Sequence, residues 1–382
     1  MRILWLTPGF AAGPQDYNCI PPLQALARAL TGQGVELHII ALEYPFVQAP
    51  YAFGPAATPA SEGAGALPAG PVDPLQPVRL PGGEDGTRPA GGATVYPCDG
   101  RNRRWLRWRT RARALDRAAA ILAEKKCDAL HSFWLGPAWA LGVQLAARHR
   151  LPHWTTLMGQ DALPQNRFLP RLEPTAAASL IALTPFHRDA LKRATGLQAA
   201  HCIPWGLEAA DIAPADSSAR RTDVLGVGSL LPVKDWVRWL RVLRRIADVR
   251  PDLRAELIGS GPEARRLRHM AGRLGLGDRL QCCGDLPRPE VLARMRQSRA
   301  LLHTARFEAF GMVLAEAPAN GCRVVSTPVG VAPALGACAD TDEALAAAVL
   351  YALDAPPTPF IRKPLMMEDT AAQYLKLYNT CV

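Results

Sequence analysis

Apolar and polar positions along the chain follow the pattern of strands that alternate with helices. Short apolar runs precede longer segments in which apolar residues recur every three or four positions, which predicts a strand followed by an amphipathic helix. The first unit is a strand at 3–6, a turn at Pro8 and Gly9, a helix over 21–34 and a strand over 36–42. Because strand, helix and strand in this order form a parallel pair, we expect an α/β fold.

The alternation continues in two series, separated by a polar stretch at 208–222. Before that stretch the predicted elements are a helix, a strand, a helix and three strands, at 114–126, 129–134, 137–150, 153–159, 179–184 and 201–206. After it, the alternation resumes from 224 to 331. A chain of 382 residues exceeds what one core usually organises. We therefore predict two Rossmann-like doubly wound domains facing across a cleft, where the carboxyl ends of parallel strands bind ligands.

The predicted domain boundaries follow these changes in composition. We place the first domain at 1–206 and the second at 207–360, with a C-terminal helix over 361–382 that packs back on the first domain. Residues 47–92 are rich in Pro, Gly and Ala and lack apolar periodicity. Such an insertion is interpreted either as a disordered segment or as a loop on the acceptor side.

Half of the formal net charge of +10 lies in one segment, because residues 99–116 hold seven arginines and two aspartates. The segment also carries apolar residues at helical spacing, at Trp105, Trp108, Ala112 and Leu115. An apolar stripe flanked by arginines is typical of a helix that lies on an anionic membrane, and it also fits a solvated basic helix whose tryptophans enter the core. An anionic membrane surface is therefore a candidate partner through Arg101 to Arg113. We expect no nucleic acid, because no recognised binding module occurs.

Nine cysteines are scattered along the chain without the spacing of a zinc site. We expect them to be reduced in a cytoplasmic protein. No apolar run approaches the roughly 20 residues that cross a bilayer. Any membrane contact is therefore expected to be peripheral, at the inner face of the cytoplasmic membrane.

Two carboxylates lie around the start of a helix predicted in the second domain. Glu308 lies in the loop after a strand, and Glu316 falls within the helix. The backbone amides of Gly311, Met312 and Val313 open this helix and form a ready site for a diphosphate. The carboxylates are then placed to bind sugar and ribose hydroxyls. The alternative is that Glu308 only caps the helix and Glu316 is a surface residue.

Three glycine turns accompany this helix. Gly228 and Ser229 end a strand, and Lys234 follows where a compact cation can meet a phosphate, although a solvated lysine also fits. Gly259 lies in IGSGPE, which resembles a short phosphate loop, and Gly330 lies in a loop after a strand.

In the first domain, His131 and Asp161 follow strands and are assigned to the acceptor side. A histidine in such a place, like His303 in the second domain, either faces the cleft or is a hydrogen-bonded core residue. Asp161 is the better candidate for a contact with a hydroxyl group.

These residues give the chain a resemblance to glycosyltransferase family 4, a retaining family with the GT-B fold. The strongest match is the E-x7-E motif at Glu308 and Glu316, within FEAFGMVLAEAPANGCRVVSTPVG. Supporting matches occur across nearly the whole chain, as GSLLPVK, IGSGPE, GDLPRPEV, HSFWLG, MGQD and IPWGLE.

The resemblance implies a role for each matched residue. Glu308 would lie beside the donor sugar, Glu316 would bind the ribose, and Lys234 would hold the diphosphate. Gly9 would border donor and acceptor. The implied reaction moves a glycosyl group from a nucleoside diphosphate sugar to an acceptor hydroxyl with retention, without a metal or other cofactor. Glycan or lipid-linked acceptors in the synthesis of a cell-envelope glycan, polysaccharide or glycolipid are the expected partners.

The chain also departs from the family pattern. Ser229 stands where many members have an arginine, which leaves Lys234 as the side-chain cation of that loop and Arg306 as a candidate replacement. Met158 stands where a histidine often contacts the donor sugar, and a methionine cannot donate a hydrogen bond. The alternatives are a nucleotide-sugar epimerase or a phosphorylase on the same fold, or a basic membrane- or nucleic-acid-binding protein without catalysis.

Overall fold

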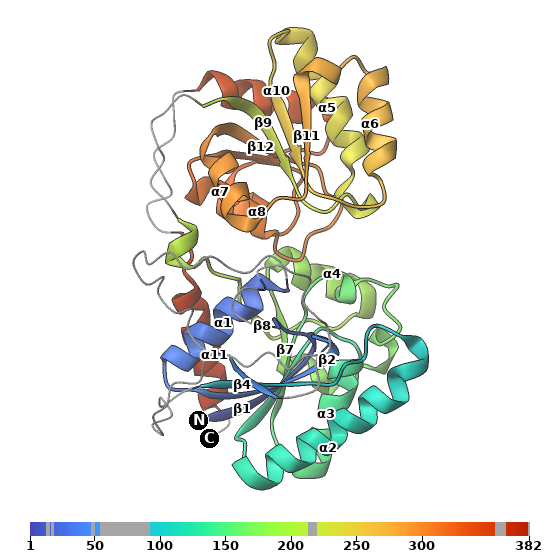
Figure 1. Ribbon diagram of the computed structural model, residues 1–382, viewed down its shortest axis with the longest axis vertical. Coiled ribbons are helices and arrows are strands. Elements are labelled where there is room, and N and C mark those ends of the chain that lie inside the picture. Colours follow the sequence, from blue (N-terminus) through green and yellow to red (C-terminus); the bar gives the residue numbers. More distant parts are fainter. Residues whose placement is uncertain are drawn as a thin grey trace, which may run out of the picture.

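The computed structural model describes residues 1–12, 16, 19–46, 50–53, 92–212, 220–355 and 364–380. It contains two α/β domains, each built on a mainly parallel sheet (Figure 1). This arrangement confirms the prediction of two Rossmann-like domains. Most of the predicted insertion at 47–92 lies outside the described residues.

The N-terminal sheet has the order β3-β4-β2-β1-β5-β6-β7-β8, and only β3 is antiparallel to its neighbour. Its strands are β1 (Arg2–Gly9), β2 (Glu36–Tyr44), β3 (Tyr51–Phe53), β4 (Ala93–Pro97), β5 (Ala129–Phe133), β6 (His153–Thr156), β7 (Leu180–Ala182) and β8 (His201–Cys202). Its helices are α1 (Pro21–Gly32), α2 (Arg107–Lys125), α3 (Pro137–His149) and α4 (Pro185–Thr195).

Alternate residues of β1 supply the cores on the two faces of this sheet. Ile3 and Trp5 pack with α1, whereas Leu4 and Leu6 pack with α2 and α3. The predicted turn at Pro8 is wrong, because β1 continues to Gly9. Proline has no amide hydrogen to donate in a regular strand pairing. Pro8 is tolerated because the pairing of β1 with β2 is irregular between Thr7 and Gly9.

The C-terminal sheet is entirely parallel, in the order β11-β10-β9-β12-β13-β14. Its strands are β9 (Thr222–Val227), β10 (Ala255–Ile258), β11 (Leu280–Gly284), β12 (Ser298–His303), β13 (Arg323–Ser326) and β14 (Ala337–Cys338). The helices after β9 are α5 (Trp236–Val249), α6 (Ala264–Arg273), α7 (Arg288–Arg296), α8 (Met312–Ala319), α9 (Ala332–Leu335), α10 (Asp342–Asp354) and α11 (Met367–Asn379). Strands β3, β4 and β14 and helices α4, α9 and α10 lie outside the predicted elements.

Helix α11 belongs to the N-terminal domain, although it ends the described chain. It lies beside α1 in the lower domain of Figure 1. Tyr374 and Tyr378 of α11 are fully buried in the core that contains Ile3 and Trp5. The returning chain pairs with the outgoing one at Leu207. Leu207 and Met366 therefore lie side by side at the edge of the N-terminal domain.

His131 is part of this core, which corrects its predicted place on the acceptor side. Its side chain is fully buried, with Nδ1 at 2.5 Å from the Tyr378 hydroxyl and Nε2 at 2.8 Å from Thr156 Oγ1. Thr156 Oγ1 also lies 2.9 Å from the Tyr374 hydroxyl. Burial lowers the pKa of His131 well below its usual range. A neutral imidazole with both nitrogens bonded ties β5 to α11 and is not free to bind a ligand.

The two domains meet at the loop that follows β12. Phe307 of this loop contacts the rings of Phe186 and His187 in α4. Thr184 Oγ1 donates a hydrogen bond of 2.8 Å to the carbonyl oxygen of Ala309. The loop that carries Glu308 is therefore held against the N-terminal domain on one side.

Within the described ranges, no helix combines the length and the apolar character needed to cross a membrane. The cysteines of the same part of the chain are all free thiols. The structure described also holds no cluster of three or more His, Cys, Asp or Glu side chains with metal-binding geometry.

Candidate functional site

Glu308 is the centre of a buried group of charges at the carboxyl end of β12. Its Oε1 accepts a hydrogen bond from Lys234 Nζ, and His303 Nε2 lies 3.1 Å from the same oxygen. A carboxylate can only accept, so Nε2 of His303 is the donor. The side chains of Glu308 and Lys234 are 14% and 18% exposed, so the pair is shielded but still accessible from one side.

Glu308 remains ionised despite its burial. Removal from water raises the pKa of a carboxyl group, but here the hydrogen bond from His303 and the positive charge of Lys234 outweigh this effect. The result is a pKa of about 2 instead of 4.5. A fixed negative charge therefore lies where the sequence predicted the carboxylate that contacts the donor sugar.

Two glycine turns shape the backbone that places Lys234. Gly228 and Gly259 have φ values of 145° and 140°, in a region that favours glycine. A Cβ atom on Gly259 would overlap the carbonyl oxygen of Gly228, so the two turns touch through their backbones. Trp236 Nε1 donates a hydrogen bond of 2.9 Å to the carbonyl oxygen of Ser229. The residue Ser229 as a whole is exposed. The predicted residues of this loop are therefore together, with Lys234 facing Glu308.

The start of α8 lies directly after Glu308. Gly311 is its N-cap residue, with a φ of 87°, and no side chain of the described residues caps the helix. The first amides of the helix, including those of Met312 and Val313, are thus available to a ligand or to water. Gly330 lies across from them, and a Cβ atom there would overlap the carbonyl oxygen of Phe310.

Glu316 lies one turn further along α8 and is 3% exposed. Its Oε1 is 2.7 Å from Arg288 Nη1, and Arg288 also donates two hydrogen bonds to the carboxylate of Asp211, at 2.8 and 3.1 Å. Arg288 therefore holds the Glu316 carboxylate in an ion pair. Burial raises the pKa of Glu316 against the opposing charge of Arg288. Glu316 is therefore not the surface residue of the alternative interpretation.

Two predicted side chains are used for other contacts. The Asp161 carboxylate accepts hydrogen bonds from the amides of Leu135, Met158 and Gly159, at 2.7 to 3.2 Å, so it holds a loop in place and its oxygens are already bonded. The predicted part of Arg306 as a replacement cation for the Lys234 loop stays a prediction. Its side chain is 71% exposed and bonds to Asp235 at 2.9 Å.

Gly9 is buried at the end of β1. A Cβ atom there would first meet Tyr44 and Cys19, both of the N-terminal domain. The predicted role of Gly9 between donor and acceptor stays a prediction, as does the effect of Met158.

Sequence reasoning missed Arg288 and Asp211, and it left His303 undecided. Arg288 was inside the quoted GDLPRPEV match, but its partner Asp211 lies in the polar stretch that was interpreted as a linker. The signal for His303 was its place at the end of a strand, five residues before Glu308. Only the fold brings Asp211, Arg288 and Glu316 together.

Comparisons with known proteins agree with this fold. Residues 210–358 match the model of the family described as glycosyl transferases group 1. Over 133 residues the chain is 32% identical to the phosphatidylinositol N-acetylglucosaminyltransferase gpi3 subunit of Schizosaccharomyces pombe, a match that covers 34% of this chain and 29% of the relative. Over 255 residues it is 28% identical to D-inositol 3-phosphate glycosyltransferase of Kribbella flavida, covering 58% and 60%. The matches thus span less than two thirds of either relative.

Solved structures resemble the whole chain. Sucrose-phosphate synthase from Thermosynechococcus elongatus superposes with a TM-score of 0.66 at 17% identity, covering 100% of this chain and 98% of that one. The lipopolysaccharide outer core galactosyltransferase WaaB superposes with a TM-score of 0.59 at 13% identity, covering 100% and 99%. At these identities the likeness shows the fold alone.

Two facing Rossmann-like domains with a returning C-terminal helix define a protein of the GT-B fold. The match over 210–358 adds that its C-terminal domain is similar to the family described as glycosyl transferases group 1.

Proposed function

We propose that this protein transfers a sugar from a nucleoside diphosphate sugar to an acceptor hydroxyl, with retention of configuration. The observation that carries the proposal is the buried, ionised Glu308, bonded to Lys234 and His303 immediately before the uncapped start of α8. A negative charge for the donor sugar thus lies beside a cation and a helix start that suit its diphosphate.

In this proposal Lys234 and the first amides of α8 bind the diphosphate and stabilise the charge that it gains on leaving. Such preorganised donors act most strongly on charge that develops in the transition state. Glu308 lies beside the sugar and stabilises positive charge at the reacting carbon. The bond from that carbon to the diphosphate oxygen breaks, and a bond to the acceptor oxygen forms on the same face. The diphosphate accepts the proton of the acceptor hydroxyl.

Glu316 would bind the ribose hydroxyls of the donor. Its charge is already held by Arg288, so the carboxylate has a fixed position before the donor arrives. Fixing a side chain in its binding position reduces the entropy lost on binding.

The acceptor and location are also part of the proposal. Both curated relatives named above are glycosyltransferases, and one carries phosphatidylinositol in its name. We propose a glycan or lipid-linked acceptor in cell-envelope glycan, polysaccharide or glycolipid synthesis, at the cytoplasmic face of a membrane. We expect transfer to proceed without a metal or other cofactor.

A donor screen tests the proposal. Purified protein is heated with UDP-, GDP-, ADP- and TDP-sugars and with the matching nucleoside diphosphates, and slow release of diphosphate is measured with and without EDTA. We expect one nucleotide to raise the melting temperature and its sugar to be hydrolysed, with no loss of rate in EDTA. If none of the donors raised the melting temperature, the proposal would be contradicted.

Two variants connect that activity to the site. Glu308→Gln should lower the rate of donor hydrolysis by orders of magnitude. Glu290→Gln, which changes an exposed residue of α7 in the same way, should keep the normal rate. Equal rates in the two variants would remove Glu308 from the reaction.

A further inference from the structure

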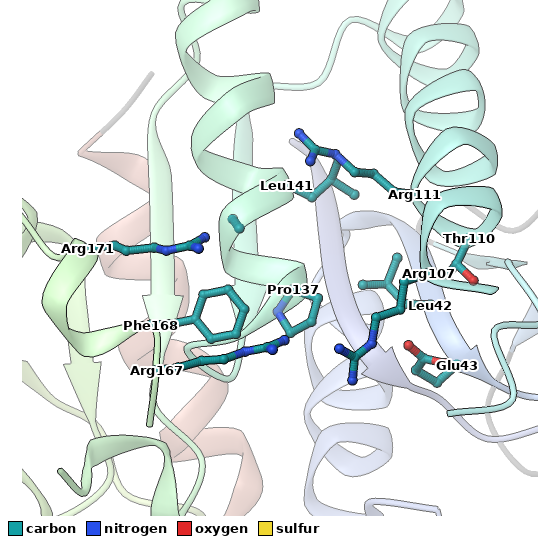
Figure 2. Close-up of a pocket in the computed structure, with 11 residues that line it drawn as sticks. Leu42, Glu43, Arg107, Thr110, Arg111, Pro137, Leu141, Arg167, Phe168 and Arg171 are labelled. Carbon is teal, nitrogen blue, oxygen red and sulfur yellow. The ribbon is translucent and has the colours of Figure 1, made fainter. Parts of the chain in front are cut away.

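A second pocket lies in the N-terminal domain, apart from the charges around Glu308. It has a volume of about 220 Å³ and lies between the first turns of α2 and α3 and the loop that follows β6. Figure 2 shows its lining, which comprises Leu42, Glu43, Arg107, Thr110, Arg111, Pro137, Ala140, Leu141, Arg167, Phe168 and Arg171. This volume is smaller than that of sites that enclose a drug-sized molecule, so it suits one small group.

Four of the lining side chains are arginines, and among the described residues they form no ion pairs. Within the described residues, none of Arg107, Arg111, Arg167 and Arg171 forms an ion pair, and Arg111 bonds only to the neutral amide of Gln144, at 2.6 Å. Glu43 is the only acidic residue of the lining, and it is bonded to a backbone amide at 2.8 Å. Four arginines and one glutamate therefore leave the described lining with an excess of positive charge.

Several basic residues of the C-terminal domain do have acidic partners. On α5, Arg238 and Arg241 pair with Asp342, and Arg245 pairs with Glu343. Like charges placed together without partners repel one another, and an anion that binds among them relieves this repulsion. The contrast indicates that the four pocket arginines are arranged for an anionic ligand.

The floor of the pocket is apolar. Leu42, Leu141 and Phe168 contribute to it, and the guanidinium groups of Arg167 and Arg171 lie 5.1 and 5.3 Å from the centre of the Phe168 ring. Such stacking fixes both arginines at the rim. A ligand for this pocket thus carries a negative charge next to an apolar part.

Two exposed tryptophans lie on or beside the same helix. Trp105 is 64% exposed and Trp108 is 72% exposed, which excludes the alternative that they enter the core. Tryptophan and arginine side chains favour the interface of a membrane, because each has an apolar part that can contact lipid and a polar end that can contact water. This neighbourhood favours a lipid over a soluble anion.

We propose that the arginine pocket binds the phosphate headgroup of an anionic phospholipid while Trp105 and Trp108 enter the interface of the same membrane. The phosphate lies among the guanidinium groups, and the first carbons of the lipid rest on the apolar floor. The beginning of α2 and the loop before Arg171 then form one membrane-facing surface. This surface is independent of the donor chemistry.

Vesicle binding tests this proposal with the full chain and without donor. Vesicles of phosphatidylglycerol and of phosphatidylcholine are sedimented with the wild type and with Arg107→Gln/Arg111→Gln. At about 1 kcal/mol for each arginine near an anionic surface, we expect the double variant to bind phosphatidylglycerol vesicles about thirtyfold more weakly. Binding to phosphatidylcholine should be weak for both proteins.

A matched variant separates the pocket from net charge. Arg265→Gln/Arg268→Gln removes the same two charges from exposed positions on α6 and should bind vesicles like the wild type. Equal weakening in both double variants would overturn the proposal. All variants should keep the melting temperature and the rate of donor hydrolysis of the wild type.

Competing ligands provide further tests. Glycerol phosphate and inorganic phosphate serve as soluble probes, and a labelled DNA duplex serves as a polyanion. Binding of these probes through Arg107 and Arg111 in the absence of vesicle binding would assign the pocket to a soluble anion or to nucleic acid and would overturn the proposal. A Trp108→Ala variant with unchanged vesicle binding would likewise contradict the part assigned to the interface.

Discussion

The Glu308→Gln variant gives a quantitative test of the charges at the site. Glutamine keeps the shape of the side chain but cannot carry the negative charge that faces Lys234 and His303. In this respect it resembles a protonated Glu308. The wild type and the variant should therefore differ in stability only where Glu308 is ionised.

The expected size follows from the pKa of Glu308, which is about 2 in the folded protein against an ordinary value of 4.5. Moving a pKa by this amount corresponds to about 3 kcal/mol. Because the folded pKa is depressed, this stabilisation is fully present above pH 4.5 and is lost as the pH falls through about 2. By the same linkage, less than half of this stabilisation should remain at pH 3.

Urea unfolding of both proteins between pH 7 and pH 3 measures this difference. We expect the wild type to be more stable than Glu308→Gln by about 3 kcal/mol at pH 7 and by less than half of that at pH 3. Glu290→Gln serves as the control, because its side chain is exposed. A difference that does not change with pH would refute the assignment of an ionised Glu308 held by Lys234.

Three further changes test other parts of the structure. Gly259→Ala should destabilise the protein and abolish stabilisation by the donor, since its Cβ atom would overlap the backbone of Gly228. In the control Gly272→Ala, on α6, the new Cβ atom meets nothing within 4 Å, so this variant should be neutral or slightly stabilising in thermal unfolding. Arg288→Leu removes the charge that faces buried Glu316 and should lower the free energy of unfolding in urea by about 3 kcal/mol or more. Unchanged stability would refute the ion pair assigned to Arg288 and Glu316. His131→Leu should lower the melting temperature without changing the KM for the donor, and a raised KM with normal stability would return this residue to the binding site.

The sequence predicted the group around Lys234 and Glu308 well because its signals are local. Strand ends, glycine turns and a helix start each show in a few neighbouring residues, and the carboxyl ends of parallel strands lie at one edge of a sheet. Gly228, Gly259 and Gly330 lie near one another for this reason. Their φ values of 145°, 140° and 54° explain why glycine occupies those positions.

The errors concern side chains whose partners are distant in sequence. Asp161 follows β6 as predicted, whereas His131 lies inside β5, and the contacts of both side chains depend on residues that no local pattern shows. His131 bonds to Tyr378, 247 positions away, and Arg288 bonds to Asp211, 77 positions away. The arginine pocket similarly joins α2 to the loop around Phe168, which the sequence did not connect.

The sequence by itself determined the fold class, the number of domains and the place of the Glu308 loop, because periodicity and turn residues act over short distances along the chain. The tertiary structure alone decided which ionisable groups are buried and which face each other. A pKa or a binding role depends on the solvent and charges around a side chain, and these are set by packing. Hence Glu308 is an ionised site residue, whereas His131, inside β5, is a neutral part of the core.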